Sequence, residues 1–210
     1  MTTPVLGNVI GKRVVFIGTG KYLETSDLST TQTQTQYAIL DDNATTTLVN
    51  PRNTLIAQTF ANTGATRTVT NNMVNFYTGR GWYVDFPDSG ERVNIDAKLI
   101  QGTLVVPSIV PSNTVCSPGG YGWLNYFNYT SGGSVIVGAS SAGSTPPPGV
   151  ASSKYDATIV GINVVYISGQ PKLGVVTSNN PTPVMNTNVQ FSANAPSFTG
   201  QRVLWRELIP

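Results

Sequence analysis

Residues 14–23 read VVFIGTGKYL, and this stretch decides how the rest of the sequence is interpreted. A phosphate-binding P-loop needs Gly, four residues, and then Gly-Lys followed by Ser or Thr. Here Gly20-Lys21 is followed by Tyr22, and Val15 stands where the first glycine is required. The third glycine of the dinucleotide-binding fingerprint is missing as well. The stretch therefore predicts a β-strand that leaves its sheet through a glycine-rich turn.

The amino-acid composition favours an all-β fold. Of the 210 residues, 40% are apolar and only 10% are charged, against about 25% charged in typical soluble domains. Asn, Thr, Ser and Gly replace the charged residues, and all four disfavour long helices. Short apolar or alternating runs recur between turn signals, which is typical of a sandwich, a barrel or a propeller. The predicted strands are residues 13–18, 36–40, 54–60, 66–70, 81–86, 91–100, 102–110, 122–130, 134–139, 157–167, 172–178 and 201–208.

Two segments depart from the strand pattern. Residues 25–36 are polar, and Ser26-Asp27-Leu28 predicts a short helical turn that begins with side-chain capping. Residues 139–153 (ASSAGSTPPPGVASS) are rich in Pro, Gly and Ser. Such a composition predicts a flexible surface loop.

Several classes of chemistry lack the residues that they need. The sequence contains no histidine and a single cysteine, Cys116, so Ser-His-Asp and Cys-His catalysis cannot be built within the chain. Cys116 is either a buried apolar side chain or pairs with a cysteine outside the chain. The basic residues are scattered, which argues against a nucleic-acid partner. No stretch approaches the roughly 18 apolar residues of a membrane span, and the N-terminus lacks a signal peptide's apolar segment.

Three acidic residues cluster around one turn of the sequence. Asp85, Asp88 and Glu91 flank the Pro-Asp-Ser-Gly turn, where close carboxylates can bind a cation weakly. The alternative is that they are charges at the rim of a sheet. They remain weak candidates for metal ligands.

Aromatic residues concentrate in two predicted strands, GWYVDF (81–86) and GWLNYFNYT (122–130). Trp82, Tyr83, Trp123 and Tyr126 can stack on sugar rings if they are exposed, or form core if they are buried. Glycoside hydrolysis needs two carboxylates across a sugar, and the sequence does not place such a pair. The chain is therefore predicted not to be an enzyme.

Three blocks of sequence, in order, resemble the PilY/PilC family of type IV pilus proteins. The first is residues 14–39, from VVFIGTGKYL through SDL to QYAI. The second, residues 79–124, holds an aromatic-acid-PDSGERV segment and a later PSNTVCSPGG. The third is GQRVLWREL at 200–208. The resemblance covers most of the chain and weakens between 131 and 190.

The resemblance implies a fold and a role. It implies that residues 1–210 are the C-terminal portion of a β-propeller, with about three to four blades' worth of antiparallel strands and long polar loops. It implies a non-enzymatic pilus biogenesis and tip adhesion module that supports pilus assembly, retraction and twitching motility. The alternative is an extracellular carbohydrate-binding module that uses the aromatics named above.

The resemblance also implies location and partners. The expected place is the bacterial surface at the pilus tip, after export through the periplasm, with the signal peptide outside this chain. Expected partners are pilins or minor pilins, host or abiotic surfaces, and other propeller parts or another copy of the chain at exposed strand edges. The family's calcium site is an Asp-rich loop that does not occur here, so no cofactor is expected.

Overall fold

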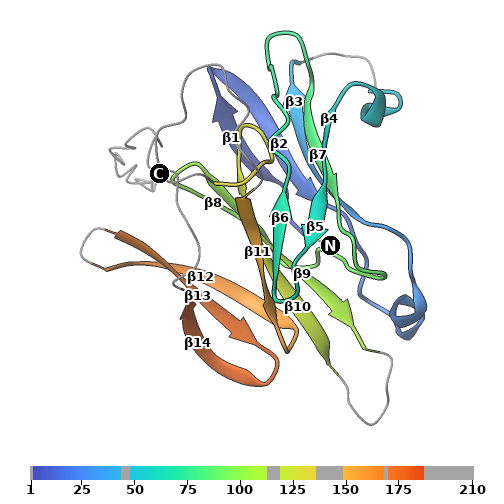
Figure 1. The fold of residues 1–210 in the computed structure, drawn as a ribbon, viewed down its shortest axis with the longest axis vertical. Coiled ribbons are helices and arrows are strands. Elements are labelled where there is room, and N and C mark those ends of the chain that lie inside the picture. The colour runs from blue at the N-terminus through green and yellow to red at the C-terminus, as the bar shows by residue number, and fades with distance from the viewer. Residues whose placement is uncertain (1, 44–47, 113–118, 136–148, 168–169, 187–210) are drawn as a thin grey trace, which may run out of the picture.

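The computed structural model describes residues 2–43, 48–112, 119–135, 149–167 and 170–186 (Figure 1). This part of the chain forms β-strands and two short 3₁₀ turns, η1 (Thr25–Ser29) and η2 (Pro51–Asn53), and contains no α-helix. The all-β fold is therefore confirmed. The strands assemble into three sheets, which we call the first, middle and last sheets.

The first sheet has five strands in the order β1-β2-β3-β7-β4. All neighbours are antiparallel except β4 and β7, which run parallel. The bounds are β1 (Val5–Val9), β2 (Lys12–Gly18), β3 (Thr35–Asp41), β4 (Ile56–Gln58) and β7 (Gly81–Asp85).

The middle sheet has six strands, and the last sheet has three, all of them antiparallel. The middle sheet has the order β5-β6-β11-β10-β9-β8, formed by β5 (Phe60–Asn62), β6 (Thr66–Val69), β8 (Lys98–Ile100), β9 (Thr103–Pro111), β10 (Gly120–Asn128) and β11 (Gly149–Tyr155). The last sheet has the order β12-β13-β14, formed by β12 (Ile159–Ile167), β13 (Gln170–Thr177) and β14 (Asn180–Asn186). Strands β5 and β6 begin the middle sheet before β7 returns to the first one.

The middle sheet is covered on both faces. Leu104 and Val106 of β9 belong to the core shared with the first sheet, whereas Val105 belongs to the core shared with the last sheet. Seven of the nine residues of β9 are buried. A strand with apolar neighbours on both sides needs a nearly continuous apolar run, and TLVVPSIVP supplies it.

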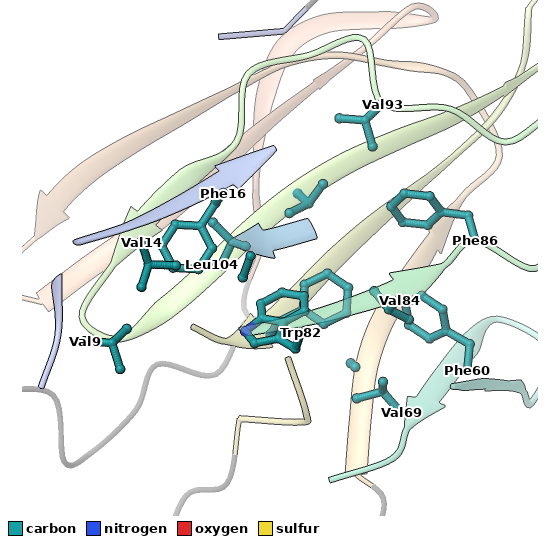
Figure 2. Close-up of a cluster of buried hydrophobic side chains, with 14 of the residues drawn as sticks. Val9, Val14, Phe16, Phe60, Val69, Trp82, Val84, Phe86, Val93 and Leu104 are labelled. Carbon is teal, nitrogen blue, oxygen red and sulfur yellow. The ribbon is translucent and has the colours of Figure 1, made fainter. Parts of the chain in front are cut away.

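Trp82 is the centre of the core between the first and middle sheets. Its ring centroid lies 6.3 Å from that of Phe16 and 5.8 Å from that of Phe127, and its indole N–H donates to the carbonyl of Tyr129. Figure 2 shows Trp82 among Phe16, Leu104 and Val84. The side chain is fully buried. Burial of such large aromatic surfaces is the main stabilising contribution to this layer.

Most of the predicted strands within the described residues are confirmed, with three corrections. Residues 54–60 do not form one strand, because β4 and β5 belong to different sheets. Residues 91–100 form only β8 and an isolated bridge at Arg92. The predicted loop at 139–153 is wrong for its last five residues, because β11 pairs with β6 and β10 there and buries Ala151. Of the predicted strand at 134–139, only Ser134 and Val135 are described, and Ser134 forms an isolated bridge with Phe127. The rest of that strand, the rest of the predicted loop and the predicted strand at 201–208 lie outside the described residues.

The stacking of the sheets agrees with part of a β-propeller-like domain, in which blades pack face to face. Propeller blades typically have four strands. Here the sheets have five, six and three strands. The first sheet includes β1 and the last sheet includes β14, two strands that the sequence did not predict. The structure is therefore blade-like in layering but irregular in blade size.

Candidate functional site

The loop at residues 87–92, directly after β7, carries the densest group of buried charges in the described part of the chain. Glu91 accepts two hydrogen bonds from Arg67 of β6, at 2.9 Å from Nη1 and 2.8 Å from Nη2. Asp88 lies 2.8 Å from the same Nη2. Arg67 and Glu91 are fully buried. We call this group, Arg67 with Asp88 and Glu91, the Arg67 junction.

Neutral groups complete the hydrogen bonding of the Arg67 junction. Arg67 Nε donates to Asn62 at 2.9 Å, and the hydroxyl of Ser108 donates to Glu91 at 2.5 Å. The Arg67 guanidinium lies 3.7 Å from the ring centroid of Trp123. A guanidinium between carboxylates and an aromatic face satisfies its charge and its donors together.

The environment shifts the pKa values of the two carboxyl groups in opposite directions. Burial raises the pKa of Glu91, and its hydrogen bonds from Arg67 and Ser108 oppose that shift. Burial also raises the pKa of Asp88, but the hydrogen bond from Trp123 and the charge of Arg67 outweigh it, so the net shift is downward. The Nη2 atom of Arg67 lies 2.8 Å from an oxygen of each carboxylate and so pairs with both charges.

Asp85, the third acidic candidate, has a different partner. It accepts two hydrogen bonds from Arg52 and a third, of 2.6 Å, from the hydroxyl of Thr35. The structure therefore pairs Asp85 with one arginine and brings Asp88 and Glu91 together at another. Among the described residues, no group of three or more acidic, histidine or cysteine side chains is arranged to hold a metal ion.

A second buried arginine explains the opening stretch of the sequence. Arg92 donates to four backbone carbonyls, those of Gly90, Lys21, Asp27 and Thr30, at distances of 2.6–2.9 Å. We call this set the Arg92 clamp. It fastens the segment after β2 to the loop at 87–92.

The glycines after β2 permit this close approach. A Cβ atom on Gly18 would lie 2.7 Å from Val93, and one on Gly20 would lie 2.6 Å from the Cβ of Arg92. The amide of Val93 donates to the carbonyl of Thr19 at 3.0 Å. The prediction of a strand that ends in a glycine-rich turn is confirmed.

The predicted helical turn is also present, as η1. The carboxylate of Asp27 accepts hydrogen bonds from the amides of Leu23 and Glu24, at 2.7 and 3.0 Å. These bonds satisfy donors at the start of the turn that would otherwise lack partners. The polar segment is thus ordered by its own aspartate and by the Arg92 clamp.

The four candidate stacking aromatics do not share a surface. Trp82, Trp123 and Tyr126 are at most 2% exposed. Tyr83 is half-buried on the first sheet, where the Arg52 guanidinium lies 4.6 Å from its ring centroid. A sugar that stacks on an aromatic ring needs an accessible face, and three of these rings have none in this arrangement.

A shallow surface hollow lies beside the Arg67 junction, at the ends of β9, β10 and β11. Tyr121, Lys154 and Asp156 contribute to its lining. The Tyr121 hydroxyl donates to Asp88 at 3.0 Å, and the Lys154 ammonium lies 4.2 Å from the Tyr121 ring centroid. Burial, followed by the hydrogen bond to Asp88, raises the pKa of Tyr121 to about 12. The hollow thus continues the buried network to the surface.

Sequence reasoning missed the residues that organise this region, namely Arg67, Arg92, Tyr121 and Lys154. An arginine within the apolar-alternating run TRTV was the available signal for Arg67, because a strand buries every second side chain. Cys116 lies outside the described residues. In the portion that the structure covers, no helix has the length and apolarity to cross a bilayer.

Comparisons with known proteins were made by sequence and by structure. No family model matches the chain. A curated Type IV pilus biogenesis factor PilY1 homolog from Xylella fastidiosa is 30% identical over 135 residues, which cover 59% of this chain and 9% of that protein. Another protein of the same name and organism is 26% identical over 224 aligned positions, covering 95% of this chain and 17% of that protein. This chain thus spans less than a fifth of either relative.

The crystal structure of the Pseudomonas aeruginosa PilY1 C-terminal domain has a similar fold. It superposes with a TM-score of 0.65 at 21% sequence identity, over 88% of this chain and 44% of that one. Likeness at this identity establishes the fold, and the sequence matches extend across nearly the whole chain. The chain is related to the PilY1 proteins and has the fold of part of a PilY1 C-terminal domain.

Proposed function

We propose that this chain is a non-enzymatic module of a type IV pilus biogenesis factor. The observation that carries the proposal is the match of both sequence relatives, which are named as type IV pilus biogenesis factors, over most of the chain. The geometry agrees with a scaffold. The acidic candidates Asp85, Asp88 and Glu91 are each bonded to an arginine, as expected of groups that hold a fold together.

The finer role that we propose is at the pilus tip on the bacterial surface. There the module supports pilus assembly, retraction and twitching motility, and takes part in attachment to host or abiotic surfaces. Its partners are pilins or minor pilins and neighbouring parts of its own propeller. A layered β-stack with little charge suits this task, because a middle sheet packed on both faces forms a rigid support for exposed loops.

The test is a deletion of the coding region for this chain in the bacterium that carries it, with complementation by variants. Deletion is expected to reduce surface pili, counted by electron microscopy, and twitching zones, and the wild-type sequence is expected to restore both. Arg92→Ala should restore them poorly, because it removes the Arg92 clamp. Arg13→Ala is the matched control, since this side chain is 59% exposed. Normal piliation after deletion would refute the role.

Adhesion needs its own readout, because loss of pili also removes attachment. Purified chain immobilised on beads is expected to bind cells or abiotic surfaces at levels that an unrelated β-protein does not reach. Beads that bind no better than this control would remove adhesion from the proposal and leave the assembly role intact.

A further inference from the structure

The last sheet protects its two edges unequally. Its order β12-β13-β14 makes β12 and β14 the edge strands, and no other described strand pairs with the outer edge of either one. Strand β14 contains Pro181 and Pro183, which lack a backbone donor and so block the addition of a further strand. Strand β12, with the sequence IVGINVVYI, contains neither proline nor a charged residue.

The two halves of β12 differ in burial. Ile159 and Ile162 lie in the core against the middle sheet. Toward the other end, Val165, Tyr166 and Ile167 are 43%, 65% and 54% exposed. Figure 1 shows this end of the β12–β13 hairpin projecting away from the middle sheet. Natural edge strands are normally short, charged, bulged or covered, and this half is uncharged and regularly paired with β13.

We propose that β12 pairs edge to edge with β12 of a second copy of this chain, around a two-fold axis near Val165. The pairing would be antiparallel, so that Val165 faces its own equivalent and Val164 faces Tyr166 of the other copy. The two three-stranded sheets would then form one continuous six-stranded sheet.

Two features favour a second copy as the occupant. A strand that pairs with itself around a two-fold axis sets the axis residue opposite its own equivalent, where two like charges would be destabilising, and the uncharged sequence of β12 meets this requirement. The exposed half also lies at the projecting end, so a two-fold axis there directs the two bodies away from one another. The pairing would satisfy the backbone groups at the outer edge of β12 and place the exposed apolar side chains beside those of the other copy.

The first test is the molar mass of the full chain by size-exclusion chromatography with light scattering, over a range of concentrations. The expected result is a reversible dimer of twice the 22.3 kDa chain mass. Val165→Lys is expected to raise the dimer dissociation constant about tenfold or more, because two ammonium groups would meet at the axis. Val160→Lys is the matched control, since this residue lies on the same strand with 55% exposure.

A charge-swap mixture tests the pairing itself. Val165→Lys and Val165→Glu should each be monomeric, with far-ultraviolet circular dichroism like that of the wild type, whereas an equimolar mixture should form a heterodimer. A wild-type chain that remains monomeric at every concentration would overturn the proposal. So would a dimer that Val165→Lys leaves intact, or a mixture that does not associate. None of these outcomes bears on the pilus role, which is measured in cells.

Discussion

At the scale of single residues, buried arginines organise this protein. Arg67 and Arg92 are at most 3% exposed, and each is surrounded by oxygen acceptors. Removing an ion from water costs several kcal/mol, which only well-placed partners offset. The two arginines solve this problem differently, because Arg67 pairs with carboxylates whereas Arg92 binds neutral carbonyls.

Replacing Arg67 should be far more damaging than replacing an arginine at the surface. Arg67→Ala would leave the buried carboxylate of Glu91 without its counter-charge and is expected to lower the free energy of unfolding by about 3–5 kcal/mol. Arg52→Ala breaks an ion pair whose side chains are 43% and 40% exposed, so a loss of at most about 1 kcal/mol is expected. Urea denaturation measures both. If both variants lost the same free energy of unfolding, Arg67 would not be the more important arginine for stability.

Tyr121 should titrate at unusually high pH. Its pKa is raised from the ordinary 10.0 to about 12 by burial and by the hydrogen bond to Asp88. The folded state therefore favours the neutral phenol, and the stability that this gives is present below pH 10 and lost as the pH rises toward 12. The phenolate absorbance is measured against pH for the wild type and for Tyr121→Phe. The difference between the two curves gives the titration of Tyr121. Asp88→Asn should lower the pKa, and an unchanged value would exclude Asp88 as a cause.

At the scale of elements, the turn after β2 depends on the absence of a side chain at Gly20. This glycine has a φ of +145°, and an added Cβ would lie 2.6 Å from Arg92 and 2.9 Å from the amide nitrogen of Val93. Gly64 also has a positive φ, of +89°, but has open space around it. A substitution at Gly64 therefore reports backbone strain alone, whereas one at Gly20 adds a steric conflict.

Gly20→Ala is accordingly expected to cost more stability than Gly64→Ala. The control should lose about 1 kcal/mol from backbone strain alone, and Gly20→Ala a further 1–3 kcal/mol, roughly, from the displaced Arg92 clamp. Thermal denaturation followed by circular dichroism compares the two. Equal melting temperatures would show that the Arg92 clamp can shift to accommodate the added methyl group without loss of stability.

The elements that the sequence predicted well are those whose pattern is local. The continuous apolar run of β9 and the aromatic run of β10 identify both strands, and a glycine-rich turn ends β2 as predicted. Strand β11 was missed because its first five residues, GVASS, continue a segment rich in Pro, Gly and Ser, and its pairing with β6 and β10 decides its conformation. The Arg67 junction was not predictable, because Glu91 stands 24 residues away in sequence and only the fold brings the two together.

At the scale of the whole molecule, the middle sheet holds the layers together. The first sheet packs on one of its faces and the last sheet on the other. The core on the last sheet's side has fewer buried residues, so the last sheet is expected to open at lower free energy than the rest.

Leu173→Ala tests this hierarchy. Leu173 of β13 is fully buried against the middle sheet, and its truncation should cost about 2–5 kcal/mol. Hydrogen exchange should then accelerate in β12, β13 and β14 while β2 and β3 keep their protection. Val14→Ala, in the opposite core, is the control and should accelerate exchange in the first sheet. Uniform acceleration in both variants would mean that the three layers unfold as one unit.

The return of β7 to the first sheet, after β5 and β6 have begun the middle one, constrains how the protein is made. While the nascent chain leaves the ribosome, β3 must wait for β7, some forty residues later, before its second edge is paired. The first and middle sheets are therefore expected to complete their folding together, because strands of one are synthesised between strands of the other. The last sheet is formed by three consecutive strands and pairs with no earlier strand. The short connection between β11 and β12 is therefore the natural place to divide the polypeptide.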